Sequence, residues 1–116
     1  MDIKNERYET FVKGVEDNSV DFVCIDPPYV GYNNKGAVWK GHKIQTELSI
    51  PNVMKEAFRI TKDNSFFAFF GQMPTIVDWH IEAVKAGFVF KEHIVWAKMK
   101  FSSPFHKIAR KHEEIF

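Results

Sequence analysis

Cysteine is almost absent from this sequence, which has Cys24 alone among its 116 residues. A single cysteine leaves no disulfide within the chain, and low cysteine use is typical of a reducing compartment. Metal-binding clusters are missing too. No two of the five histidines share a helix face at ligand spacing, and no second cysteine accompanies them. We therefore expect neither a disulfide framework nor a metal site.

Long apolar runs and an excess of one charge are also lacking. The longest apolar run, Phe66 to Phe70, is far shorter than the roughly 20 residues that span a bilayer. Because charged residues are scattered through the first twenty positions, we expect no secretory signal there. Lys and Arg total 16 against 15 acidic residues, so net charge alone indicates no partner. With 12 Phe for a core, we expect a soluble, cytoplasmic domain with no membrane partner.

Hydrophobic spacing predicts alternating helices and strands along the chain. A short helix is expected around Tyr8 to Val15, and a long loop rich in Gly and Asn over Val30 to Gln45. Strands are predicted over Val20–Ile25, Phe66–Phe70, Phe88–Ala97 and His112–Phe116. Longer helices are predicted from Ser49 to near Lys62–Asn64, and from Pro74 to a C-terminal cap at Gly87.

This order predicts an α/β fold with a doubly wound, mostly parallel sheet. The strands Val20–Ile25 and Phe66–Phe70 are apolar on both faces, so we expect them to be neighbouring central strands covered by helices on each side. The last two strands have no helix between them, and we expect them to form an antiparallel pair at one edge.

The segment with the clearest chemistry is Asp26-Pro27-Pro28-Tyr29, which directly follows the predicted strand Val20–Ile25. In doubly wound sheets, ligands bind outside the carboxyl ends of the strands. An exocyclic amino group on a nucleobase is a poor nucleophile because its lone pair is delocalised into the ring. The Asp26 carboxylate and the Pro27 carbonyl are two acceptors for its N–H groups, and such hydrogen bonds localise the lone pair on nitrogen.

The prolines and the tyrosine fit the same chemistry. Proline fixes φ near −65° and donates no N–H, so Pro27 and Pro28 hold the acceptors in a rigid turn. Tyr29 offers a flat face on which an extruded base can stack. The alternative is a strand that ends in a polyproline turn with an exposed tyrosine and no role in chemistry.

The stretch from Asn18 through Asp26-Pro27-Pro28-Tyr29 resembles the catalytic region of the N6-adenine and N4-cytosine DNA methyltransferases. The leading Asp is similar to the adenine enzymes, because the cytosine enzymes usually begin this motif with Ser or Thr. Trp96-Ala97-Lys98 and His112 to Phe116 are similar to the paired terminal strands of that region. The resemblance implies base flipping and methylation of adenine N6 in DNA, as in restriction-modification systems.

The resemblance also implies the cofactor S-adenosylmethionine, which this family binds through a glycine-rich turn between a strand and a helix. None of the six glycines here forms a G-x-G pattern. We therefore expect residues 1–116 to be a single partial domain, the catalytic half of a methyltransferase. The cofactor half is then expected from a missing segment or a second chain, and this chain alone is expected to bind the cofactor weakly or not at all.

A basic stretch near the end of the chain is a candidate DNA-binding edge. It contains Lys98, Lys100, Lys107, Arg110 and Lys111, with no acidic residue among them. Lys and Arg contacts to phosphate supply most non-specific affinity for DNA. A solvated hairpin loop is the other interpretation of this stretch.

Two other functions compete with DNA adenine methylation. The chain is either a shortened methyltransferase that acts as a DNA- or protein-binding module, or an enzyme that methylates an RNA base or a glutamine amide. Related motifs for the last two substrates usually begin with Asn, so Asp26 favours adenine.

Overall fold

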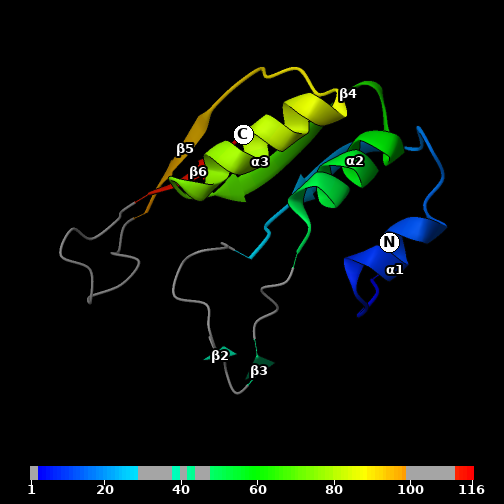
Figure 1. Ribbon diagram of the computed structural model, residues 1–116, viewed down its shortest axis with the longest axis horizontal. Coiled ribbons are helices and arrows are strands. Elements are labelled where there is room, and N and C mark those ends of the chain that lie inside the picture. Colours follow the sequence, from blue (N-terminus) through cyan, green and yellow to red (C-terminus); the bar gives the residue numbers. More distant parts are fainter. Residues whose placement is uncertain (1–2, 29–37, 40–41, 44–47, 99–111) are drawn as a thin grey trace.

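The computed structural model describes residues 3–28, 38–39, 42–43, 48–98 and 112–116 (Figure 1). Its helices are α1 (Tyr8–Phe11), the 3-10 helix η1 (Val12–Gly14), α2 (Ile50–Ile60) and α3 (Thr75–Ala86). Its strands are β1 (Val20–Ile25), β2 (Val38–Trp39), β3 (His42–Lys43), β4 (Thr61–Gly71), β5 (Ile94–Ala97) and β6 (His112–Ile115). Within these ranges, no helix is both long and apolar enough to cross a membrane.

Four strands form the main sheet in the order β1-β4-β6-β5, and β2 and β3 pair separately. β1 and β4 are parallel, with Phe22 opposite Phe66 and Ile25 opposite Phe69. This confirms the prediction that the two apolar strands are parallel neighbours. β5 and β6 are antiparallel and complete the sheet at the far edge, as predicted.

The expected mostly parallel, doubly wound sheet is not found in the described part of the chain. β4 and β6 pair antiparallel, so the sheet is mixed, with one parallel and two antiparallel pairs. β1 lies at the edge of this sheet and not at its centre, which corrects the prediction of two central strands. The reason is that only α2 connects neighbouring parallel strands, since α3 leads to β5, which pairs with β6 alone.

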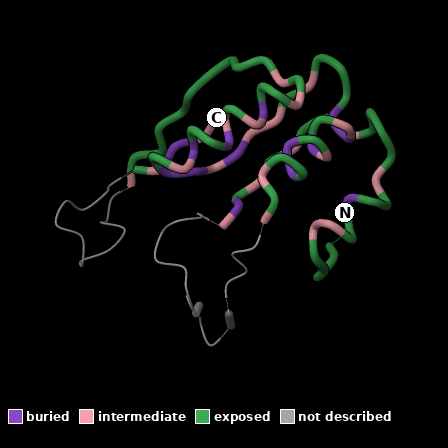
Figure 2. The backbone as a smooth tube through the Cα atoms, viewed as in Figure 1, coloured by how far each residue is buried: buried purple, intermediate pink, exposed green. Residues whose placement is uncertain are grey.

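Both long helices cover the same face of the sheet (Figure 1). The core lies between them and β4, and Figure 2 shows its buried residues on α2, β4 and α3. It comprises Val53, Met54, Phe69, Ile76, Trp79 and Ala83. Phe22 and Phe66 are 57% and 65% exposed. The expectation of helices on both faces of the sheet is therefore wrong for the described residues. Two-sided burial does not explain why β1 and β4 are rich in apolar residues.

Three boundaries differ from the sequence-based prediction. α2 ends at Ile60, because Thr61 adopts an extended backbone (φ −72°, ψ 131°) and its hydroxyl donates to the Ala57 carbonyl at 2.7 Å. β4 consequently begins at Thr61 and not at Phe66. The last helix ends as predicted, because Gly87 adopts φ 120° after Ala86. The predicted strand Phe88–Ala97 is reduced to Ile94–Ala97.

Hydrogen bonds from Arg59 join the N-terminal segment to α2. Its guanidinium donates to the carbonyls of Val12 and Val15 at 2.8 and 2.9 Å, and to Asp17 Oδ1 at 2.5 Å. It also pairs with Glu56 one turn earlier on the helix. These bonds fix the segment before β1 against α2, and they thereby fix the position at which β1 begins.

Candidate functional site

The candidate site lies at the carboxyl end of β1. Asp26, Pro27 and Pro28 follow directly on the last residue of the strand, Ile25, which lies opposite Phe69 of β4. The Asp26 side chain is exposed, Pro27 is buried and Pro28 is half-buried. The motif therefore joins a fixed, buried proline to a solvent-accessible carboxylate, beside a second parallel strand.

The backbone of this turn is rigid for a local reason. Proline restricts its own φ, and it also biases the preceding residue to an extended conformation. Asp26 thus continues the direction of β1, and burial of Pro27 anchors the turn to the domain. Such a turn presents a carboxylate and carbonyl groups with little conformational freedom, which suits it to accept hydrogen bonds from a planar amine.

The neighbouring strand ends in a turn of different character. After Gly71, the buried Gln72 accepts two hydrogen bonds at its carbonyl, from Thr75 Oγ1 at 2.8 Å and from the Ile76 amide at 3.0 Å. These bonds begin α3. Because β1 and β4 are parallel and Ile25 lies opposite Phe69, the two strands end at the same edge of the sheet, β1 leading into Asp26 and β4 into the turn before α3.

A cofactor cradle needs open space beside a glycine that follows a strand. A Cβ built on Gly71 meets Ile76 Cγ1 at 2.7 Å, so the protein's own side chain fills this space. Gly87 is closed in the same way by the Phe58 ring, also at 2.7 Å. Gly14 lies in η1, with nothing within 4 Å of its added Cβ, and it does not follow a strand. The described residues do not form the glycine-rich turn that the resemblance leads us to expect for S-adenosylmethionine.

A buried carboxylate that the sequence did not single out lies on β6. Glu114 is 9% exposed and pairs with Gly71 in the sheet register. Its Oε1 lies 3.7 Å from His112 Nε2, and its Oε2 has no hydrogen-bond partner among the described residues. The apolar-polar alternation of a half-buried strand would have placed Glu114 on the solvent side, so no pattern in His112–Phe116 signalled this burial.

Among the residues predicted to bind DNA, the structure describes only Lys98. Its Nζ forms an ion pair with the Glu113 carboxylate and lies 5.2 Å from the centre of the Trp96 ring. Lys98 thus already has an acidic partner across the β5–β6 pair. The other predicted DNA contacts lie outside the described residues, namely Lys100, Lys107, Arg110 and Lys111. Tyr29 of the catalytic motif lies outside them as well.

The imidazoles and carboxylates in the described ranges do not gather into a metal site. No group of three or more His, Cys, Asp or Glu side chains there is arranged to hold an ion. Cys24, expected in a buried strand, is exposed, because no helix among the described residues covers that face of β1.

These features define the class of the protein. It is an α/β domain whose candidate site lies at the carboxyl end of a parallel strand. A crystal structure described as the M1.HpyAVI–SAM complex is similar to it, with a TM-score of 0.60 at 15% sequence identity. The match covers 93% of this chain and 45% of that one, so the chain spans less than half the length of this solved structure. A comparison with curated proteins found no match.

A family model described as DNA methylase, for the N6 and N4 methyltransferases, matches residues 20–116. The chain therefore belongs to the N6/N4 DNA methyltransferase family. The match begins at the first residue of β1 and includes Asp26, Pro27 and Pro28. The resemblance noted from the sequence is thereby confirmed.

Proposed function

We propose that this chain is the catalytic portion of an enzyme that transfers a methyl group to N6 of adenine in DNA. The observation that carries the proposal is the position of Asp26, an exposed carboxylate on a proline turn at the carboxyl end of β1, in a member of the N6/N4 family. Asp26 as the first residue of the Asp26-Pro27-Pro28-Tyr29 motif favours adenine over cytosine as the methylated base, as the sequence resemblance implies.

In this proposal, Asp26 and Pro27 act on the amino group of an adenine extruded from the duplex. The Asp26 carboxylate accepts one N6–H and the Pro27 carbonyl accepts the other. The nitrogen lone pair is then withdrawn from the ring and becomes available for attack. As nitrogen gains positive character in the transition state, the Asp26 charge stabilises it more than it stabilises the ground state. In the same proposal, the Asp26 carboxylate receives the proton that leaves N6.

Tyr29 is proposed to stack on the extruded adenine. Removing a base from the duplex costs a few kcal/mol, by rough estimate, and stacking on an aromatic ring offsets about 1–3 kcal/mol of that. We propose that Lys100, Lys107, Arg110 and Lys111 contact the phosphate backbone of the DNA. Lys98 is the weakest of the proposed phosphate contacts, because Glu113 competes for its charge.

The proposed cofactor is S-adenosylmethionine, which supplies the methyl group as an electrophile when it is bound. Two observations favour a cofactor site built by polypeptide other than the described residues. The space beside Gly71 is filled by Ile76, and the chain spans only 45% of the M1.HpyAVI–SAM chain. Isothermal titration of the 116-residue chain is therefore expected to show no low-micromolar binding of S-adenosylmethionine. Such binding would mean that a cofactor site exists within the chain.

Product analysis tests the proposed reaction. The protein as its gene encodes it is incubated with isotopically labelled S-adenosylmethionine and unmethylated DNA, which is then digested to nucleosides. The proposal expects label in N6-methyladenine. Label in N4-methylcytosine would show that the family assignment is right and the base is wrong. DNA binding without any transfer would favour a binding module instead.

A further inference from the structure

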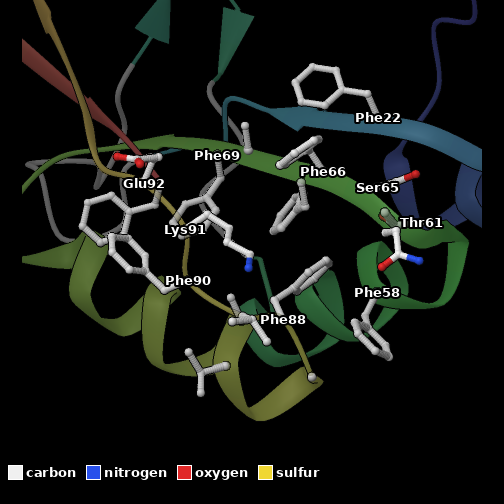
Figure 3. A pocket seen from close by; sticks show the side chains of 18 of the residues that line it. Phe22, Phe58, Thr61, Ser65, Phe66, Phe69, Phe88, Phe90, Lys91 and Glu92 are labelled. Atoms are coloured by element: carbon white, nitrogen blue, oxygen red, sulfur yellow. The ribbon is translucent and has the colours of Figure 1, made fainter.

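The β5–β6 pair is attached to the rest of the sheet over a short length. Among the described residues, β6 pairs with β4 at Phe70 and Gly71, and Phe116 adds two backbone hydrogen bonds. A pocket of about 720 Å³ follows beside the earlier part of β4 (Figure 3), and both Ile94 and Ile115 line it. The amino end of β5 thus borders open space, so the position of the β5–β6 pair depends on contacts at its other end.

At that other end, the two strands are joined by an ion pair. Trp96 lies opposite Glu113, and the ammonium of Lys98, two positions later, pairs with the Glu113 carboxylate. The side chains of Lys98 and Glu113 are 25% and 12% exposed, against 44% and 82% for Lys62 and Asp21, which pair β4 with β1. Water and salt screen the less exposed pair less, and loss of either partner leaves the other charge uncompensated.

This ion pair lies at the edge of the sheet that holds Asp26. β1 is parallel to β4, and β5 runs in the same direction because β4 and β5 are both antiparallel to β6. The ammonium of Lys98 lies 5.2 Å from the centre of the Trp96 ring, which packs edge-on against Phe70 with 6.3 Å between ring centres. Continuing the β1–β4 register by one residue places Asp26 beside Phe70. Contacts therefore lead from the ion pair across the sheet to the candidate site.

The same ion pair joins the two ends of the segment that carries the other proposed phosphate contacts. Lys98 is the last described residue before positions 99–111, and Glu113 lies just after them. An ammonium that is held by a carboxylate has less charge to offer a DNA phosphate. The position of Lys98 therefore fits a role in holding these ends together better than a phosphate contact of its own.

We propose that Lys98 and Glu113 are a positioning pair for DNA binding, which fixes both ends of positions 99–111 at the edge of the sheet that holds Asp26. Lys98 then acts through Glu113, and this role replaces the weak phosphate contact considered above. The inference rests on the proposed function, because it concerns the DNA that the enzyme methylates. Its distinctive consequence is that Glu113, an acidic residue, supports the binding of a polyanion.

The DNA affinity of Glu113→Gln tests the proposal by its sign. Affinity is measured by fluorescence anisotropy of a labelled duplex, with the protein as its gene encodes it and well below the Tm of each variant. We expect Glu113→Gln to bind on the order of fivefold more weakly, although loss of an anion alone favours DNA binding. Asp21→Asn removes the same charge from the more exposed pair and is expected to bind no more weakly than the wild type. Tighter binding by Glu113→Gln would overturn the proposal, because it would show that Glu113 only competes with phosphate for Lys98.

The salt dependence of binding separates the two roles of Lys98. Loss of one phosphate contact lowers the slope of log affinity against log salt by about 0.9. We expect Lys98→Met to weaken binding about as much as Glu113→Gln while it leaves this slope unchanged. Lys62→Met removes the same charge from the control pair and is expected to have little effect. A slope that falls by about 0.9 in Lys98→Met would refute the positioning role.

Exchanging the two residues completes the test. Lys98→Glu combined with Glu113→Lys keeps the ion pair and the net charge, and we expect it to bind DNA within about twofold of the wild type. This variant also decides the matter if a single variant fails to fold. An exchanged pair that binds as weakly as the single variants would contradict the proposal. A wild-type protein that binds no duplex would contradict the proposed function as well, whereas tighter binding by Glu113→Gln contradicts this inference alone.

Discussion

Gly71 offers a sharp test of how β4 packs against α3, since a single methyl group added there has no room. In Gly71→Ala, the new Cβ meets three atoms of Ile76: Cγ1 at 2.7 Å, Cδ1 at 2.8 Å and Cβ at 2.9 Å. Ile76 is completely buried, so its side chain has no solvent-facing position to move to. Because the Ile76 Cβ is attached to the helix backbone, relief requires α3 itself to shift away from β4.

Overpacking of a buried site costs about 1–3 kcal/mol, and three contacts below 3.0 Å place this substitution in the upper part of that range. We expect Gly71→Ala to lower the free energy of unfolding by about 2–3 kcal/mol, measured by urea denaturation. The matched control is Gly14→Ala, because nothing lies within 4 Å of the added Cβ there. That variant is expected to stay within about 0.5 kcal/mol of the wild type.

A double-mutant cycle identifies the cause. Ile76→Ala alone leaves a cavity and costs about 2–5 kcal/mol, but it removes the two atoms closest to the new methyl group. Gly71→Ala combined with Ile76→Ala should therefore be less destabilised than the sum of the single variants, by about 1 kcal/mol or more. Strict additivity, or a Gly71→Ala variant as stable as Gly14→Ala, would refute this account of the packing.

The contacts of α2 and α3 and the half-buried Tyr8 phenol support three further predictions. Gly87→Ala, at φ 120° and against the Phe58 ring, should lower stability by about 2 kcal/mol or more in urea denaturation. Arg59→Ala should lower the Tm and speed hydrogen exchange in the turn before β1, whereas Lys55→Ala, exposed on the same helix, should do neither. Burial raises the pKa of Tyr8 above its ordinary value of 10.0, so its contribution to stability is full below that pH and is lost as pH rises through the folded pKa. Tyr8→Phe should therefore flatten the alkaline limb of stability against pH.

Much of the local structure followed from the sequence because it depends on neighbouring residues. The spacing of apolar residues identified both long helices, Gly87 marked the end of α3, and two apolar runs became parallel neighbours. Asp26-Pro27-Pro28 was located at the end of its strand because a β-branched run ended in two prolines. Each of these features is set by a few consecutive residues.

The errors came from features that depend on distant parts of the chain. Apolar character on both faces of β1 and β4 was interpreted as burial by helices on each side, yet α2 and α3 share one face and leave Phe22 and Phe66 exposed. A strand pattern does not specify which element covers it. Burial of Glu114 opposite Gly71 and pairing of Lys98 with Glu113 also depend on the β4–β6–β5 register, which no local pattern encodes.

The initial rate of methyl transfer to adenine in Asp26→Asn tests the central claim most directly. The variant keeps the shape of the side chain but removes its charge and turns one acceptor into a donor. Asp21→Asn is the matched control, an exposed carboxylate on the same strand that pairs with Lys62. We predict a fall of about 10²-fold or more for Asp26→Asn, with DNA affinity little changed, and a rate near that of the wild type for Asp21→Asn. An Asp26→Asn protein that methylates adenine as fast as Asp21→Asn would contradict the assignment of Asp26 as the group that activates N6.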